Sequence, residues 1–227
     1  MKQLFVVLMM LVYVSSYSQE FEYTKIKLDS IQKVNDISEK TKNEFYAVGL
    51  KEHLMIEYAF VDKDVVMYQT LHKKTLVIND NGVDHFNRVY IPTSRIIELV
   101  DIKARSITAA GKVIDFDKSN IKEVENLENA GGYKIFAVDG VEKGSIVEVL
   151  YTTKNVVNVS GKYSFQEEFP VLDTKFEIIF PKELIFNVKA YNWNFVKEDT
   201  LLGEKQHLRY TCDSIGPLRE EKYSTYN

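Results

Sequence analysis

The stretch that decides the fold is Ile96–Phe116, IIELVDIKARSITAAGKVIDF, together with Gly140–Thr152, GVEKGSIVEVLYT. In both, apolar and polar side chains alternate over a few residues before a glycine interrupts the run. A period of two is typical of strands, because successive side chains of a strand point to opposite faces of a sheet. Similar runs recur between glycine and proline residues as far as Pro181, and no helix-length pattern dominates. This part of the chain therefore predicts an antiparallel sheet.

Segments before and after this stretch carry related patterns. The predicted strands are 47–58, 65–78, 83–91, 96–107, 113–116, 133–138, 145–152, 163–169, 174–180, 184–191 and 207–212. In 47–58, one face is expected to carry Val48, Leu50, Leu54, Ile56 and Tyr58, and the other Lys51, His53 and Glu57. Short strands at spacings of roughly 8 to 12 residues are the signature of a β-sandwich or barrel. The sequence predicts a mainly β fold, an antiparallel two-sheet β-sandwich.

Glycine-containing turns separate several of these strands. Asn81-Gly82 predicts a tight hairpin between 65–78 and 83–91, because both residue types tolerate the positive backbone angles of such a turn. A second reversal is expected at 109–112, where the sequence reads Ala-Ala-Gly-Lys. Gly140 and Gly144 are expected to be further turn points, since glycine adopts left-handed backbone geometry without steric cost.

The first residues have the organisation of an export signal. Lys2 is the charged start, 4–14 is an apolar run of eleven residues, and 16–18 supplies small residues at the spacing of a cleavage site. A membrane-spanning helix needs about 20 apolar residues, which this run does not reach. We therefore expect a signal peptide at 1–18 and a mature protein in the bacterial periplasm or secreted, without a membrane anchor after cleavage.

The remaining chain is expected to form an extension and one large domain. The extension is 19–46, in which the apolar spacing after Ser30 favours a short helix up to Phe45. The β-sandwich domain is 47–227, with a candidate sub-boundary near 171–181. Between residues 117 and 132, apolar side chains three apart favour a short helix, whereas Asn and Gly residues favour a loop.

Charge and cysteine content exclude some function classes. The chain has 29 basic and 33 acidic side chains. Removal of residues 1–18 takes away one lysine, so 28 basic side chains remain against 33 acidic ones and the net charge is near −5. Lysine and glutamate are interspersed rather than segregated, which argues against nucleic acid as a partner. A single cysteine, Cys212, allows no disulfide within the chain.

No catalytic or metal site is predicted from the reactive residue types. Cys212 would need a nearby base to form a thiolate, but His207, five residues away on one strand, would point to the opposite face. The four histidines, His53, His72, His85 and His207, are too scattered for a local zinc motif, although distant strands could bring them together. The acidic turn 79–84 fails as a calcium loop, because Val77 and Arg88 would occupy ligand positions. We expect no cofactor.

Aromatic side chains give the one candidate ligand site. No nucleophile elbow, dinucleotide fingerprint or phosphate loop is present, and pairs such as Glu167-Glu168 are adjacent rather than opposed across a cleft. Tyr191 and Trp193 alternate with Asn192 in a polar segment, as in a platform on which a sugar ring stacks. The alternative is that Trp193 is a core or edge residue with its N–H satisfied.

A set of short motifs resembles a known bacterial family. The motifs are 104–108 (ARSIT), 111–114 (GKVI), 144–151 (GSIVEVLY), 169–171 (FPV) and 180–181 (FP), and 215–221 (IGPLREE) resembles the end of that domain. In order and spacing they resemble the domain of unknown function that precedes a transglutaminase-like domain in exported proteins. The resemblance covers about 47–227. It implies a two-sheet β domain without an assigned catalytic role.

The resemblance leaves several functions open. Members of that family commonly continue into a papain-like transglutaminase fold, whose Cys, His and Asp carry out the chemistry. This sequence is expected to be a stand-alone copy, a truncated reading frame or a fragment. Our leading hypothesis is a non-catalytic accessory or binding module, whose partner is a transglutaminase-like domain, another protein, or cell-wall glycan or peptide. The alternatives are the N-terminal part of a cysteine-dependent hydrolase and a carbohydrate-binding module.

Overall fold

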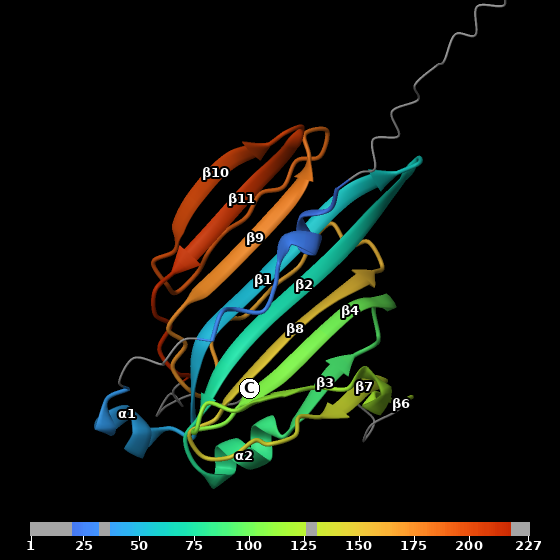
Figure 1. The fold of residues 1–227 in the computed structure, drawn as a ribbon. Helices are drawn as coiled ribbons and strands as arrows, with labels where there is room; N and C mark the ends of the chain where they lie inside the picture. The colour runs from blue at the N-terminus through green and yellow to red at the C-terminus, as the bar shows by residue number, and fades with distance from the viewer. Residues whose placement is uncertain (1–19, 32–36, 126–130, 219–227) are drawn as a thin grey trace, which may run out of the picture.

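The computed structural model describes residues 20–31, 37–125 and 131–218 (Figure 1). The predicted signal peptide at 1–18 lies outside the described residues. Strands make up 49% and helices 11% of the structure, so the prediction of a mainly β fold is confirmed. Among the described residues, no helix combines the length and the apolar character needed to span a membrane.

The strands form one large and one small sheet. The large sheet contains β1 (Ala47–Val61), β2 (Asp64–Val77), β4 (Ile96–Ile107), β5 (Val113–Asp115), β8 (Ile146–Asn155), β9 (Thr174–Pro181), β10 (Val196–Leu202) and β11 (Lys205–Cys212). Its order is β10-β11-β9-β1-β2-β8-β4-β5. The small sheet has the order β3-β7-β6 and contains β3 (Arg88–Pro92), β6 (Lys122–Val124) and β7 (Tyr133–Ala137). The described helices are η1 (Glu22–Lys25), α1 (Glu39–Glu44), α2 (Asp80–Phe86) and η2 (Lys118–Asn120).

The large sheet is mixed, which corrects the prediction of purely antiparallel pairing. β1 and β9 pair in parallel from Glu52↔Thr174 to Glu57↔Ile179, whereas the other pairs in this sheet are antiparallel. The pairings make β8, β9 and β10 run in the same direction as β1. Strands that run in the same direction need a long connection, because the chain must return to the starting end. The segments 156–173 and 182–195 are these two connections.

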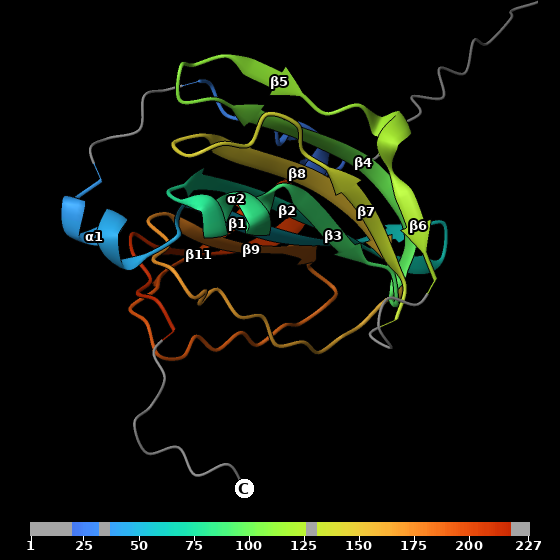
Figure 2. The ribbon, with the colours of Figure 1, turned by 90° about the horizontal axis from the view of Figure 1, so that it is seen from below.

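Both return segments are irregular, so the predicted strands at 163–169 and 184–191 are wrong. Their alternation has another cause. Phe165, Phe186 and Val188 pack onto the sheet, while neighbours such as Lys162 and Lys189 are exposed. Figure 2 shows these loops running beside β9 and β11. A coil that lies along an apolar surface buries every second side chain as a strand does, but it lacks the backbone hydrogen bonds that pair strands in a sheet.

The hydrophobic core lies on one face of the large sheet and has two parts. Over β1, β9 and β11 the core contains Leu54, Ile56, Tyr58, Met67, Phe176, Ile178, Phe180, Leu208 and Tyr210, and the loop residues cover it. Over β2, β4 and β8 the small sheet covers the core, where Ile91 and Phe136 pack against Ile102, Val147 and Val149. The covering layer is therefore part sheet and part loop, and the finer prediction of a two-sheet sandwich stays a prediction.

A bulge in β1 changes the expected alternation at one end of the strand. The register with β2 shifts between Gly49 and Lys51, so two residues of β1 face one of β2. Val48 therefore does not share the face of Leu54 as predicted, whereas Leu54, Ile56 and Tyr58 do lie together in the core.

The Asn81-Gly82 hairpin and the strand at 83–91 are wrong in their first part. Asn79 accepts a hydrogen bond from the Gly82 amide and caps α2, and only 88–92 form the strand β3. Glycine is required here by close packing rather than by a turn: a Cβ at Gly82 would lie 2.3 Å from the carbonyl oxygen of Tyr46. A stretch of acidic and amide residues suits a helix N-terminus as well as a turn, which explains the error.

Of the remaining predictions, the glycine turns are confirmed, whereas the predicted helices differ from the structure and one edge strand was missed. The turn at 109–112 joins β4 to β5, and Gly111, Gly140 and Gly144 all have positive φ. The predicted helix at 30–45 is reduced to α1, capped by Ser38 rather than Ser30, and 32–36 lie outside the described residues. Instead of the helix expected around 121–127, the strand β6 is present, and Leu127 lies outside the described residues. The edge strand β10 was not predicted, because all seven of its residues are exposed and lack an apolar face.

Gly82→Ala is expected to lower the free energy of unfolding by about 1–3 kcal/mol, the usual cost of overpacking. Alanine normally favours a helix over glycine, but here its Cβ would meet the backbone of Tyr46. The measurement is urea denaturation, with Asn81→Ala at the exposed neighbouring position as the control. A Gly82→Ala variant as stable as the control would contradict the close approach.

Candidate functional site

A pocket of about 600 Å³ lies between the large sheet and the two return segments, and we call it the aromatic pocket. Its floor is formed by Ile56, Tyr58, Phe176, Ile178 and Tyr210, which project from β1, β9 and β11. Its walls are residues 159–166 and 185–193. Ligand pockets in proteins usually measure roughly 300–1,000 Å³ and are mostly apolar, and this pocket has both properties.

Ring contacts attach the walls to the floor. The Phe186 ring stacks on Tyr58 with a centroid distance of 4.7 Å and lies 5.0 Å from Phe180. The Tyr163 ring lies 5.8 Å from Phe176, so both walls rest on floor residues. Each such aromatic pair contributes about 0.5–1.5 kcal/mol beyond its area of burial. The pocket is therefore built on paired strands and has walls of loop anchored by aromatic rings.

Two tyrosine hydroxyls complete the attachment. The Tyr58 hydroxyl donates a hydrogen bond to the carbonyl of Asn158, and the Tyr210 hydroxyl lies 3.4 Å from the carbonyl of Val188. Burial, and to a smaller extent the neighbouring Tyr163, raises the pKa of Tyr58 to about 12. Tyr58 is therefore a neutral donor at physiological pH, not a general base.

Tyr191 and Trp193 line the aromatic pocket, but they do not form the predicted flat platform. Tyr191 is 71% exposed at the rim. Trp193 is partly buried, and a Cβ at Gly216 would lie 3.1 Å from its six-membered ring. Asn192 between them has a positive φ of 70°, so the segment is a bend rather than a strand. The packing of Trp193 agrees with the structural alternative, and a ligand role for either residue stays a prediction.

The opposite face of the large sheet carries buried charges, and we call it the charged face. Its central members are Glu57 on β1, Glu148 on β8 and Glu177 on β9; Glu57 and Glu148 are 0% exposed and Glu177 is 6% exposed. Residues 20–31, which we call the N-terminal strap, lie in front of this face in Figure 1. The Tyr23 amide donates to Glu57 at 3.2 Å, and Lys205 pairs with the same carboxylate at 2.7 Å.

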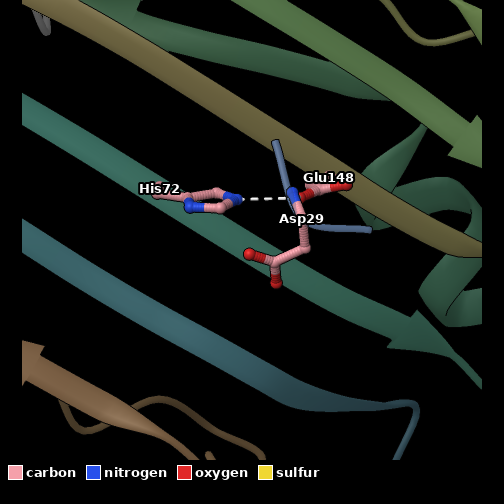
Figure 3. Close-up of side chains that lie close together, drawn as sticks. All are labelled: Asp29, His72 and Glu148. Atoms are coloured by element: carbon pink, nitrogen blue, oxygen red, sulfur yellow. Dashed lines mark hydrogen bonds and ion pairs between the residues drawn. The ribbon is translucent and has the colours of Figure 1, made fainter. Parts of the chain in front are cut away.

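Glu148 joins the strap to three strands. It accepts hydrogen bonds from His72 Nε2 (2.8 Å), from the Asp29 amide (2.8 Å) and from Arg105 Nε (2.8 Å). Figure 3 shows His72, Asp29 and Glu148 close together. Burial alone would raise the pKa of Glu148, but these three donors outweigh it and lower the pKa to about 2. Ligand atoms of Asp29, His72 and Glu148 lie within 4.8 Å of one another, which is a spacing found in metal sites.

The charges around this trio do not favour a divalent cation. Lys51 Nζ lies 2.5 Å and Lys74 Nζ 3.6 Å from the carboxylate oxygens of Asp29, and Arg105 pairs with Glu148. Three cationic side chains therefore already face two carboxylates. A metal ion would have to displace them, so we interpret the trio as a structural ion-pair network that holds the strap in place.

A second network surrounds Glu177. Its Oε1 atom lies 2.9 Å from His207 Nε2 and 2.9 Å from Arg209 Nε, and its Oε2 atom lies 2.5 Å from His53 Nε2. Burial would raise the pKa of Glu177, but the hydrogen bond from His207 and the nearby His53 and Lys175 hold it below its ordinary value. Burial lowers the pKa of His53 despite the carboxylate beside it.

The histidines and the cysteine lie at separate places in the fold. His53, His72 and His207 lie on the charged face, and His53 and His72 are cross-strand partners, whereas His85 belongs to α2 and packs against Tyr46. Cys212 lies on the other face of β11, as predicted: its neighbours are the cluster around Phe169 and Ile215, and its thiol lies 3.4 Å from the carbonyl of Ser214. The structure therefore places His207 and Cys212 on opposite faces of one strand.

The aromatic pocket itself was missed from the sequence. Its walls lie in segments that the alternation of Phe165, Phe186 and Val188 predicted to be strands. One signal could have revealed it: strands β8, β9 and β10 are joined by long segments of 18 and 14 residues, more than antiparallel neighbours need.

The stability of the fold is expected to fall as the pH drops from about 4.5 towards 2. The pKa of Glu148 is lower in the folded state, so its stabilisation is present above its unfolded pKa and is lost as the pH falls through the folded value of about 2. Glu177 acts in the same direction. The measurement is the free energy of unfolding in urea at a series of pH values.

Glu148→Gln is expected to flatten this pH dependence. At neutral pH the variant should lose about 3–5 kcal/mol, because Arg105 is left without its buried partner. Glu183→Gln, an exposed change in a loop, is the control and should keep the wild-type profile. Equal pH profiles for the two variants would contradict the assignment to Glu148.

Comparison with known proteins gives a family and a fold. The family model described as a domain of unknown function with a solved structure, DUF3857, matches residues 64–217. No curated protein matches the chain significantly. A crystal structure described as a putative protease from Parabacteroides distasonis is similar in fold, with a TM-score of 0.65 and 12% identity. The match covers 80% of this chain and 38% of that one, so this chain corresponds to little more than a third of that protein.

Proposed function

The chain belongs to the DUF3857 family, and on that premise we propose that it is a non-catalytic binding module, an exported β-sandwich module that serves a larger protein or assembly. The aromatic pocket is its binding site. One observation carries this proposal: an apolar pocket of about 600 Å³ with a floor of paired strands and a rim of exposed apolar side chains. Ile185, Val159 and Tyr191 on this rim are 94%, 78% and 71% exposed.

The chemistry of the pocket supports binding rather than catalysis. Its floor is formed by hydrocarbon side chains and by two tyrosines whose hydroxyls face backbone carbonyls of the loops. Catalysis would require a nucleophile or an acid–base pair at the pocket. Glu57, Glu148, Glu177 and three histidines lie on the opposite face of the sheet, where the N-terminal strap binds Glu57 and Glu148. Glu52 is buried on the same face as the pocket floor, but it pairs with Lys73 and does not line the pocket. The two faces are thus divided between a binding pocket and a stabilising charge network.

A second candidate is the N-terminal part of a cysteine-dependent, transglutaminase-like hydrolase. The observation that favours it is the similarity in fold to part of a longer chain described as a protease. In that case the pocket would position a substrate or contact the catalytic domain. Sequencing the reading frame beyond Asn227 separates the candidates, since a following domain with Cys, His and Asp would favour the second.

Partner and location are part of the same proposal. The signal-like residues 1–18 support export to the periplasm or the medium, where cell-wall peptide and glycan are within reach. Carbohydrate contact would use the exposed ring of Tyr191, because Trp193 is occupied by its packing against Gly216. Glycan binding that survives Trp193→Ala and Tyr191→Ala would remove this surface from consideration.

The aromatic pocket is expected to bind the neutral apolar dye N-phenyl-1-naphthylamine, with a rise and a blue shift of its fluorescence. Ile185→Asp should weaken binding about tenfold, because it places a charge on the apolar rim. Ile97→Asp is the matched control, since Ile97 is 62% exposed on β4 and does not line the pocket. No dye binding by the wild type, or equal loss in both variants, would count against the proposed site.

The purified chain is expected to show no peptide hydrolysis that thiol alkylation inhibits. The physical reason is that Cys212 and His207 project from opposite faces of β11, so His207 does not activate the thiol. The measurement is turnover of a fluorogenic peptide by the wild type and Cys212→Ser, which should be equally inactive. Turnover that disappears in Cys212→Ser would overturn the non-catalytic function.

A further inference from the structure

The lining of the aromatic pocket has an uneven charge. Lys162 lies on one wall and Lys189 on the other, and among the residues that the structure describes no aspartate or glutamate lines the pocket. This differs from the chain as a whole, which has 33 acidic against 29 basic side chains. The pocket therefore combines an apolar interior with positive charge from both walls.

Both lysine side chains are available to an occupant. Lys162 and Lys189 are exposed, and neither forms an ion pair with a carboxylate of residues 20–31, 37–125 or 131–218. Most lysines of the charged face, by contrast, are engaged: Lys51, Lys74 and Lys205 all pair with carboxylates. Lys162 and Lys189 are thus not engaged in an ion pair with the described part of the chain.

Arg95 adds to the positive potential on one side of the pocket. Its carbonyl accepts a hydrogen bond from the Val156 amide, at the start of the first return segment. Burial raises the pKa of the nearby Tyr163, and the charge of Arg95 opposes this rise. The Arg95 charge therefore reaches a residue that lines the pocket.

The floor of the aromatic pocket disfavours a ligand whose buried part is polar. Ile56, Phe176 and Ile178 on the floor offer no hydrogen-bond partner, so sugar hydroxyls or peptide amides placed on them would be buried without partners. The serine, glutamine and asparagine residues of the lining lie on the walls: Ser160, Ser164, Gln166, Asn187 and Asn192. A hydrocarbon body has no such cost and gains from burial among the rings. An acidic group at the mouth would gain charge-assisted hydrogen bonds from the two lysines.

We propose that the aromatic pocket binds a free anionic amphiphile, a single acyl chain that ends in a carboxylate. The acyl chain lies on the floor formed by β1, β9 and β11, and the carboxylate lies between Lys162 and Lys189. This inference rests on the proposed function, because it names the ligand class of the same site. It adds a preference for the sign of the head group, which the pocket volume alone does not give.

The test compares three amphiphiles with the same chain length below their micelle concentrations. Dodecanoate, dodecyltrimethylammonium and dodecyl maltoside compete with N-phenyl-1-naphthylamine for the full chain. Dodecanoate is expected to displace the dye at a concentration about tenfold lower than the cationic amphiphile, with a difference that shrinks as salt is added.

A charge reversal tests the two lysines. In the double variant Lys162→Glu, Lys189→Glu the preference is expected to invert towards dodecyltrimethylammonium, which a merely structural change would not produce. The matched control is Lys63→Glu, Lys112→Glu, at two exposed lysines outside the pocket, and it should keep the preference for dodecanoate. The thermal midpoint of each variant reports that the fold is retained.

The outcomes separate this inference from the proposed function. Dye binding with equal displacement by all three amphiphiles would overturn the inference and leave the binding module standing. Absence of dye binding would overturn both. Binding to vesicles with anionic lipids, without displacement of the dye by monomeric dodecanoate, would replace the free amphiphile with a membrane surface and would also overturn the inference.

Discussion

The parallel pairing of β1 with β9 is the constraint on which the rest of the structure depends. Because β8, β9 and β10 all run in the direction of β1, the chain must cross the length of the sheet twice, through 156–173 and 182–195. Neither crossing contains a helix or strand. Both lie on the apolar face, and the space between them is the aromatic pocket. The site is thus a direct consequence of the strand order.

The charged face shows how the same sheet tolerates buried acids. Glu148 and Glu177 each lie between neighbours that supply a histidine and an arginine, so each carboxylate keeps its charge at the centre of a hydrogen-bonded network. Backbone amides of the N-terminal strap donate further hydrogen bonds to Glu57 and Glu148. Most buried charges of the large sheet are thus paired on one face, while the opposite face carries the hydrophobic core.

Local patterns in the sequence correspond to structure only where the segment pairs with a neighbouring strand or forms a turn. Alternation identified β1, β2, β4, β8, β9 and β11, because apolar side chains face the core on one side of the sheet and mainly polar ones lie on the charged face. The glycines at 111, 140 and 144 marked real turns. The same rule failed for 163–169 and 184–191, since a coil on an apolar surface shows the same alternation. It also missed β10, which buries nothing. The parallel pair and the histidine-carboxylate networks depend on contacts between distant residues, which no short spacing in the sequence encodes.

The walls of the aromatic pocket are irregular loops and its floor is formed by paired strands, and these two parts differ in how well they tolerate sequence change. Lengthening a loop costs little, about 0.6 kcal/mol for each doubling, whereas a one-residue slip within a ladder turns every side chain over. Insertions and substitutions in 159–166 and 185–193 can therefore reshape the cavity without altering the register beneath it. Related chains with the same sheet can accordingly differ in what they accommodate, as antibodies do through variable loops on a constant framework.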